Sequence, residues 1–115
     1  MIQKTKANQI TKTIQKLNDI HRQHIPFTRV MLSATVSKLN PSELSDVIKA
    51  VKNYNDFNQD NDFYQEHDFG KITVNGKNYF WKIDYYDQDL EYLSPAPENC
   101  EITKRVLTIM ASWEY

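Results

Sequence analysis

The sequence predicts a small α+β protein, and three observations support this fold class. An Asn75-Gly76 pair lies between two runs of alternating residues, which predicts a β-hairpin. Two segments have apolar residues at helical spacing, and the last apolar run has the composition of a central strand. Together these elements indicate a small, mostly antiparallel sheet of about four strands with two helices packed on one face. At 115 residues we expect one domain, residues 1–115.

The first predicted element is an amphipathic helix from about residue 5 to residue 24, followed by a body from about residue 27 to residue 115. Pro26 stops the helix. Its apolar stripe consists of Ile10, Ile14, Leu17, Ile20 or His21, and His24. The other face is basic, because residues 1–29 contain six Lys or Arg and the single acid Asp19.

The body begins with a predicted strand over residues 27–36, which are β-branched and apolar. Asn40, Pro41 and Glu43 then supply an N-cap, a proline at the first helical position and an early acid, so we expect a second helix to about Tyr54. The core stripe of this helix is Leu44, Val47 or Ile48, Val51 and Tyr54. Residues 55–65 are rich in Asn and Asp and predict a loop.

The Asn75-Gly76 turn fixes the register of the hairpin. We expect four residue pairs: Val74 with Lys77, Ile72 with Tyr79, Gly70 with Trp81, and Asp68 with Ile83. One face is then apolar, and on the other face His67 lies opposite Asp84. Residues 87–103 contain two prolines and predict a loop, and residues 105–113 predict a final, central strand.

His67 opposite Asp84 is a candidate catalytic pair, since a carboxylate that orients an imidazole creates a general base. No nucleophile motif accompanies the pair, so a structural hydrogen bond is the simpler interpretation. A divalent metal is a further alternative, with Glu66, His67, Asp68 and Asp84 as ligands, joined by Asp62. Adjacent strand residues point to opposite faces, which argues against that site, and we expect no cofactor. His21 and His24 lie one helical turn apart but have no third ligand in the sequence.

Acidic residues are concentrated in two runs, residues 54–68 and 83–103, that contain no Lys or Arg. The simplest interpretation is a solvated surface, and the alternative is one acidic patch for a basic partner. We expect the partner-binding residues to be Asp56, Asp60, Asp62, Glu66, Asp68, Asp84, Asp87, Asp89 and Glu91. We do not expect direct binding of nucleic acid, because these carboxylates repel phosphate.

Aromatic residues concentrate in and after the hairpin and could stack bases, but those on its apolar face are expected to form the core. Phe69 and Phe80 lie on the other face. If no helix covers them, they form an exposed apolar patch typical of a protein-docking surface.

Three strings of the sequence resemble one known family. They are Glu66-His67-Asp68-Phe69-Gly70, then Phe80-Trp81-Lys82-Ile83-Asp84-Tyr85-Tyr86-Asp87, then Arg105-Val106-Leu107-Thr108-Ile109-Met110 with Glu114-Tyr115. The chain is similar from about Phe27 to Tyr115 to the domain-of-unknown-function family three-seven-six-eight. That family usually has Pro and Gly where this chain has Phe63 and Gln65. The resemblance implies a bacterial protein of plasmids, integrated elements or phages, and it implies no activity.

The composition also indicates where in the cell the protein acts. The single Cys100 cannot form an internal disulfide, and no apolar run is long enough to span a bilayer, so we expect a cytoplasmic protein. Together with the resemblance, this setting leads to the expectation of a non-enzymatic protein-binding module that inhibits a host defence system, as an anti-CRISPR or anti-restriction protein does. Its partner would be a host protein or ribonucleoprotein complex with a basic surface. The alternative is a small metal-dependent or His-dependent hydrolase centred on His67 and Asp84.

Overall fold

The computed structural model describes residues 2–115, with side-chain burial described from Lys6 onward. The elements follow in the order α1 (Ile2–Gln23), β1 (Val30–Leu32), α2 (Ala34–Ser37), α3 (Pro41–Lys52), β2 (Phe69–Val74), β3 (Lys77–Tyr86), β4 (Lys104–Ala111) and the 3-10 turn η1 (Ser112–Glu114). This arrangement is the small α+β fold that the sequence predicts. Among the described helices, none has both the length and the hydrophobicity of a membrane span.

The four strands form one sheet in the order β1-β4-β3-β2. The hairpin of β2 and β3 has the predicted register, with Val74 opposite Lys77 and Gly70 opposite Trp81. Gly76, at the turn, has a φ of 76°, the conformation that favours glycine. β3 and β4 are antiparallel, whereas the short edge strand β1 is parallel to β4, so the sheet is mixed.

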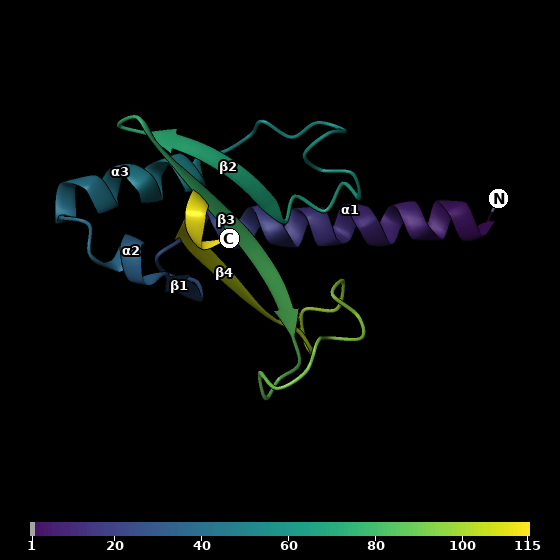
Figure 1. The fold of residues 1–115 in the computed structure, drawn as a ribbon. Coiled ribbons are helices and arrows are strands. Elements are labelled where there is room, and N and C mark those ends of the chain that lie inside the picture. The colour runs from purple at the N-terminus through teal and green to yellow at the C-terminus, as the bar shows by residue number, and fades with distance from the viewer. Residues whose placement is uncertain (1) are drawn as a thin grey trace.

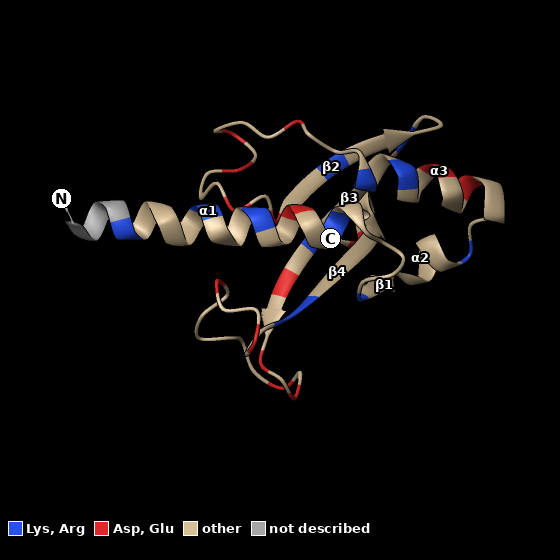
Figure 2. Cartoon of the chain, turned by 180° about the vertical axis from the view of Figure 1, so that it is seen from behind, with Lys and Arg blue, Asp and Glu red and all other residues tan. Residues whose placement is uncertain are grey.

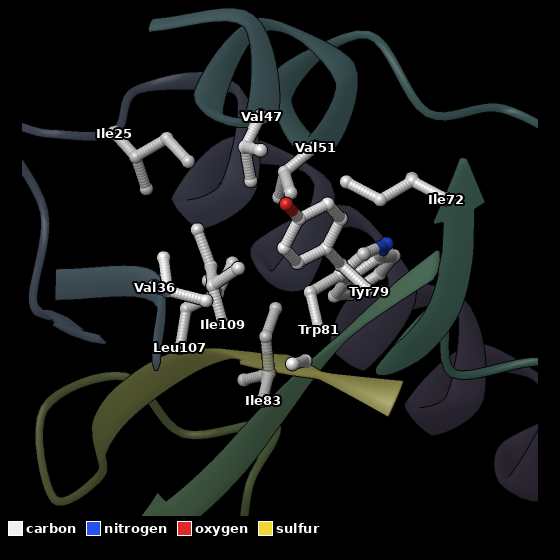
Figure 3. Close-up of a cluster of buried hydrophobic side chains, with 11 residues drawn as sticks. Ile25, Val36, Val47, Val51, Ile72, Tyr79, Trp81, Ile83, Leu107 and Ile109 are labelled. Carbon is white, nitrogen blue, oxygen red and sulfur yellow. The ribbon is translucent and has the colours of Figure 1, made fainter. Parts of the chain in front are cut away.

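The helices lie on one face of the sheet, which we call the helix face, and Figure 1 looks onto the other, open face with α1 and α3 behind the strands. Side chains of β3 and β4 alternate between the two faces. On the helix face, Trp81, Leu107 and Ile109 are fully buried against Val47 and Val51 of α3 (Figure 3). The predicted stripe of this helix is therefore confirmed in its two central residues. Its N-cap is also confirmed, since Asn40 Oδ1 accepts a hydrogen bond from Glu43 N at 2.8 Å.

Two expectations about the N-terminal half are corrected. The predicted strand over residues 27–36 is much shorter, because Ser33 caps the one-turn helix α2 directly after β1. The buried side of α1 is also different from the predicted stripe. It combines Ile14 with the polar Asn18 and Arg22, while Ile10 and Ile20 are exposed.

Candidate functional site

His67 lies in the loop before β2 and not on the strand. Gln65 and His67 have φ values of 59° and 56°, so the chain is not extended here and the alternation of side chains is broken. His67 Nδ1 lies 3.0 and 3.1 Å from the two carboxylate oxygens of Asp19 on α1. The imidazole ring stacks on Phe57, with centroids 3.8 Å apart and an angle of 4° between the rings.

The predicted pairing of His67 with Asp84 is therefore wrong. Asp84 lies on β3 on the open face, where its carboxylate accepts a hydrogen bond from Lys82 Nζ at 2.9 Å. The positive φ of His67 instead directs its ring toward α1. His67 and Asp84 therefore do not form a catalytic pair.

A second carboxylate, that of Asp62, lies on the other side of the His67 ring. Asp62 Oδ2 is 3.5 Å from His67 Nε2, and Asp62 Oδ1 accepts a hydrogen bond from the backbone N of His67 at 3.1 Å. Asp62 is only 7% exposed, so its carboxylate interacts mainly with protein groups and little with solvent. Both ring nitrogens thus face carboxylates, and both can donate a hydrogen bond only when the ring carries two protons.

Arg22, on the buried side of α1, belongs to the same cluster. It is 2% exposed, and its Nη2 donates to Asp19 Oδ1 at 2.9 Å. Its Nη1 donates to the carbonyls of Val51 and Lys52 at 3.3 and 3.1 Å, which satisfies acceptors at the end of α3. The guanidinium also lies over the Trp81 ring at 5.4 Å. Asp19 is consequently shared between Arg22 and His67, and the cluster joins α1, α3 and the loop.

A second network lies next to the first. Asn18 Nδ2 donates to Glu66 O at 2.9 Å and to the Tyr85 hydroxyl at 2.8 Å, and the Tyr85 hydroxyl donates to Glu66 Oε1 at 2.7 Å. Arg105 Nε donates to Asn18 Oδ1 at 2.6 Å, and its Nη2 donates to Pro97 O at 2.6 Å. Burial, followed by the bond to Glu66, raises the pKa of Tyr85 far above its usual value. We call the two networks together the polar junction: Asn18, Asp19, Arg22, Asp62, Glu66, His67, Tyr85 and Arg105.

Sequence reasoning missed the residues that α1 contributes to the polar junction. Asn18, Asp19 and Arg22 lie within one helical turn, and Asp19 is the only acid among the first 29 residues. A lone acid with an arginine three residues later is a weak signal of a local ion pair. Nothing in the sequence connects that pair to His67, which lies 48 residues away.

A cavity of about 240 Å³ opens beside His67. It is lined by Gln15, Phe57, Asn58, Gln59, Asp62, Gln65 and His67. None of these seven side chains carries a hydroxyl or a thiol that could act as a nucleophile. Ser94 and Thr103 hydrogen-bond to each other at 2.6 Å in the other long loop, and Cys100 is exposed there.

The metal-binding alternatives find no matching geometry in the described residues, where no three His, Cys, Asp or Glu side chains are grouped to hold a metal ion. His21 Nε2 is bonded to the carbonyl of Arg29 at 2.9 Å, and His24 Nδ1 to that of Ile20 at 2.7 Å. Both histidines thus interact with the backbone near the end of α1.

The predicted partner-binding acids fall into a packed group and an exposed group. Asp62, Glu66, Asp68 and Asp84 are buried or half-buried near the start of β2. Burial, and then the charges of Glu66, Asp62 and Asp84, raise the pKa of Asp68 to about 6. In contrast, Asp56, Asp60, Asp89 and Glu91 are exposed, while half-buried Asp87 accepts bonds from the backbone N of Asp89 and Glu91.

The exposed acids form two surfaces rather than the single expected patch. We call residues 53–68 the first acidic loop and residues 87–103 the second acidic loop. Figures 1 and 2 place these loops on opposite sides of α1, whose surface carries lysines. Neither loop contains a Lys or Arg. The two acidic loops therefore expose carboxylates on both sides of α1.

The comparisons with known proteins agree with the resemblance of the sequence strings. The family model described as "Protein of unknown function (DUF3768)" matches residues 32–114. This match covers well over half of the chain, so the chain belongs to that family. It includes α2, α3, the strands β2, β3 and β4 and both acidic loops, and it leaves α1 and most of β1 outside. No curated protein and no solved structure matches the chain.

Proposed function

We propose that this member of DUF3768 is a non-enzymatic protein-binding module that docks onto a basic surface through its two acidic loops. One observation carries the proposal: exposed Asp56, Asp60, Asp89 and Glu91 project from loops that contain no Lys or Arg. None of these four carboxylates forms an ion pair with a described residue, so their charge is available to a partner. Complementary charge favours fast and specific association.

The charge of the acidic loops and the family resemblance together indicate the class of partner. A surface that attracts carboxylates is rich in Lys and Arg, as nucleic-acid-reading surfaces are. The family resemblance suggests carriage by plasmids, integrated elements or phages. We therefore propose that the protein acts in the cytoplasm as an inhibitor of a host defence complex, by occupying a basic surface that would otherwise bind nucleic acid.

The geometry favours this function over a hydrolase. A hydrolase centred on His67 and Asp84 would need the two side chains on the same side of the sheet, whereas His67 faces Asp19 and Asp62 beneath α1. Every polar atom of the His67 ring is already directed at a carboxylate of the fold. We therefore assign the polar junction a structural role and the acidic loops the binding role.

The experiment begins with capture of bound proteins from a bacterial host lysate and their identification by mass spectrometry. Calorimetry with the purified partner then compares wild type with the fourfold variant Asp56→Lys, Asp60→Lys, Asp89→Lys and Glu91→Lys. These four positions are exposed, whereas reversal of Asp62 or Asp87 would break bonds of the fold. We expect the fourfold variant to lose binding and to fold normally.

Single reversals supply the matched control. Asp60→Lys in the first acidic loop and Asp46→Lys on α3 change the net charge equally, and both positions are exposed. Only Asp60→Lys should weaken binding, and wild-type binding should weaken steeply with added salt. Equal affinities for wild type and the fourfold variant, or affinity that does not respond to salt, would contradict the proposal.

A further inference from the structure

The open face of the sheet carries aromatic rings interleaved with lysines. The strand register places Phe69 beside Lys82 and Lys71 beside Phe80, so rings and ammonium groups alternate across β2 and β3. The two phenyl rings lie 5.3 Å apart, and the ring of Tyr115 lies 5.5 Å from Phe69 and 5.3 Å from Phe80. Tyr115 is 76% exposed. We call Phe69, Phe80 and Tyr115 the aromatic cluster.

The fold holds this cluster in place. Glu114, directly before Tyr115, accepts hydrogen bonds from Ser33 Oγ at 2.6 Å, Ala111 N at 2.8 Å and Thr35 N at 3.3 Å. The bond from Ser33 is the main reason why the pKa of Glu114 falls to about 2. η1 is thereby anchored to β4 and α2, and Tyr115 is positioned over the sheet before any ligand arrives.

The charge of the open face is opposite to that of the acidic loops. Lys71, Lys82 and Lys104 lie on this face, where Asp84 is the one carboxylate among the β2, β3 and β4 residues. Lys71 is exposed, and Lys82 is bonded to Asp84. The acidic loops lie on either side of α1 in Figures 1 and 2, and they contribute no residue to β2, β3 or β4. The repulsion of phosphate expected from the acidic loops is therefore weaker on the open face.

We propose that the open face binds single-stranded nucleic acid. Bases of one strand stack on the aromatic cluster, and the ammonium group of exposed Lys71 contacts its phosphates, while Lys82 stays paired with Asp84. Stacking on aromatic side chains of an open sheet, combined with nearby positive charge, is the general chemistry of single-strand recognition. Because every base has a flat π face, this contact tolerates many sequences. The site is separate from the acidic loops, so it does not depend on the proposed partner.

A second copy of the chain is an alternative occupant of the open face. Exposed Met31 lies in register with Thr108 at the β1 edge of the sheet, whereas Lys71 lies on β2 at the opposite edge. In a face-to-face dimer, however, Lys71 and Lys82 of both copies would be brought close together, and like charges oppose such contact. The alternation of rings with lysines fits a polyanion with flat bases better.

The test is fluorescence anisotropy with a labelled oligothymidine of about 15 nucleotides, a length within the range that single-strand binders cover. We expect saturable micromolar binding by the folded full chain that weakens as salt is raised. Tyr115→Ala and Lys71→Glu should each weaken binding about tenfold or more. Both positions are exposed, so circular dichroism should show unchanged folding.

Lys16→Glu on α1 is the matched control, because it is an exposed lysine with the same charge change away from the open face. It should change affinity less than about twofold, since the contact is local. Absence of saturable binding by wild type at low salt, or equal losses in Lys16→Glu and Lys71→Glu, would overturn the proposal. Light scattering that shows a dimer which Tyr115→Ala dissociates would also overturn it, in favour of a second copy as the occupant.

Discussion

The two faces of the sheet are completed in different ways. On the helix face, α1 and α3 cover an apolar core, and the polar junction supplies partners for most buried polar groups. The Nε1 of Trp81 and the Nε of Arg22 are the described buried side-chain atoms without a partner, and the Arg22 guanidinium lies over the Trp81 ring. On the open face, rings and lysines remain accessible. A residue with a fully engaged side chain is therefore expected to stabilise the fold, and an accessible one to bind.

The largest expected effect is on the helix face, at Arg22. Arg22→Ala should lower the free energy of unfolding by about 3 kcal/mol, because it leaves Asp19 and the carbonyls at the end of α3 without their buried partner. Lys82→Ala removes the comparable pair with Asp84 on the open face and should cost less than about 1 kcal/mol. Urea denaturation of both variants checks the difference. Similar losses would show that the two faces are not distinguished in this way.

The next effect is steric. A Cβ at Gly70 would collide with the Trp81 ring and lie 2.8 Å from Tyr54 Cζ, so Gly70→Ala should cost about 2 kcal/mol. A Cβ at Gly76 meets no atom within 4 Å, and Gly76→Ala should cost only about 1 kcal/mol, owing to its positive φ. Thermal denaturation of the two variants distinguishes the contact from the backbone preference. A larger loss at Gly76 would mean that the hairpin turn dominates.

Asp68 should make stability depend on pH in a defined direction. Its pKa is raised in the folded protein to about 6 from an ordinary 3.8, so the folded state binds its proton more tightly than the unfolded state does. Stability is therefore lost as pH rises from about 4 to about 6. Asp68→Asn should raise the melting temperature by a few degrees at pH 7.5 and leave it unchanged near pH 3. An equal shift at both pH values would point to a cause other than titration.

The smallest effect on stability is expected on the open face. Lys71→Glu should change the free energy of unfolding by less than about 0.5 kcal/mol, because the side chain is exposed and forms no ion pair with a described residue. The same variant should clearly weaken binding to single-stranded DNA. A loss of more than about 1 kcal/mol in urea denaturation would assign Lys71 to the structural part of the molecule instead.

The hairpin and α3 could be predicted because local chemistry specifies them. Asn75-Gly76 sets the register, so three of the four predicted pairs lie in the ladder between β2 and β3. Asp68 lies just outside the ladder, and its carbonyl accepts a hydrogen bond from Ile83 N at 2.8 Å. Asn40 with Pro41 begins a helix whose apolar spacing identifies Val47 and Val51. The position of His67 could not be predicted in this way. Alternation holds only while the chain is extended, and the positive φ at Gln65 and His67 ends it in a stretch without glycine.

The polar junction could not be predicted from the sequence for a different reason. Helical periodicity identifies apolar stripes, whereas the buried side of α1 contains Asn18 and Arg22. A buried polar residue becomes favourable only through partners that are distant in the sequence, such as Tyr85 and Arg105. The sequence shows where acidic residues concentrate, but the division between packed Asp62 and exposed Asp60 depends on how the loop folds.

One capture experiment, which compares His67→Asn with the fourfold reversal of the acidic loops, separates the structural residues from the binding residues. The amount of partner bound per folded protein is measured alongside the melting temperature. We predict that His67→Asn lowers the melting temperature and still captures the partner, because His67 stabilises the fold through Asp19 and Asp62. The fourfold reversal should melt like wild type and capture nothing. A His67→Asn protein that melts like wild type but no longer captures the partner, or a fourfold variant that still captures it, would contradict this assignment of roles.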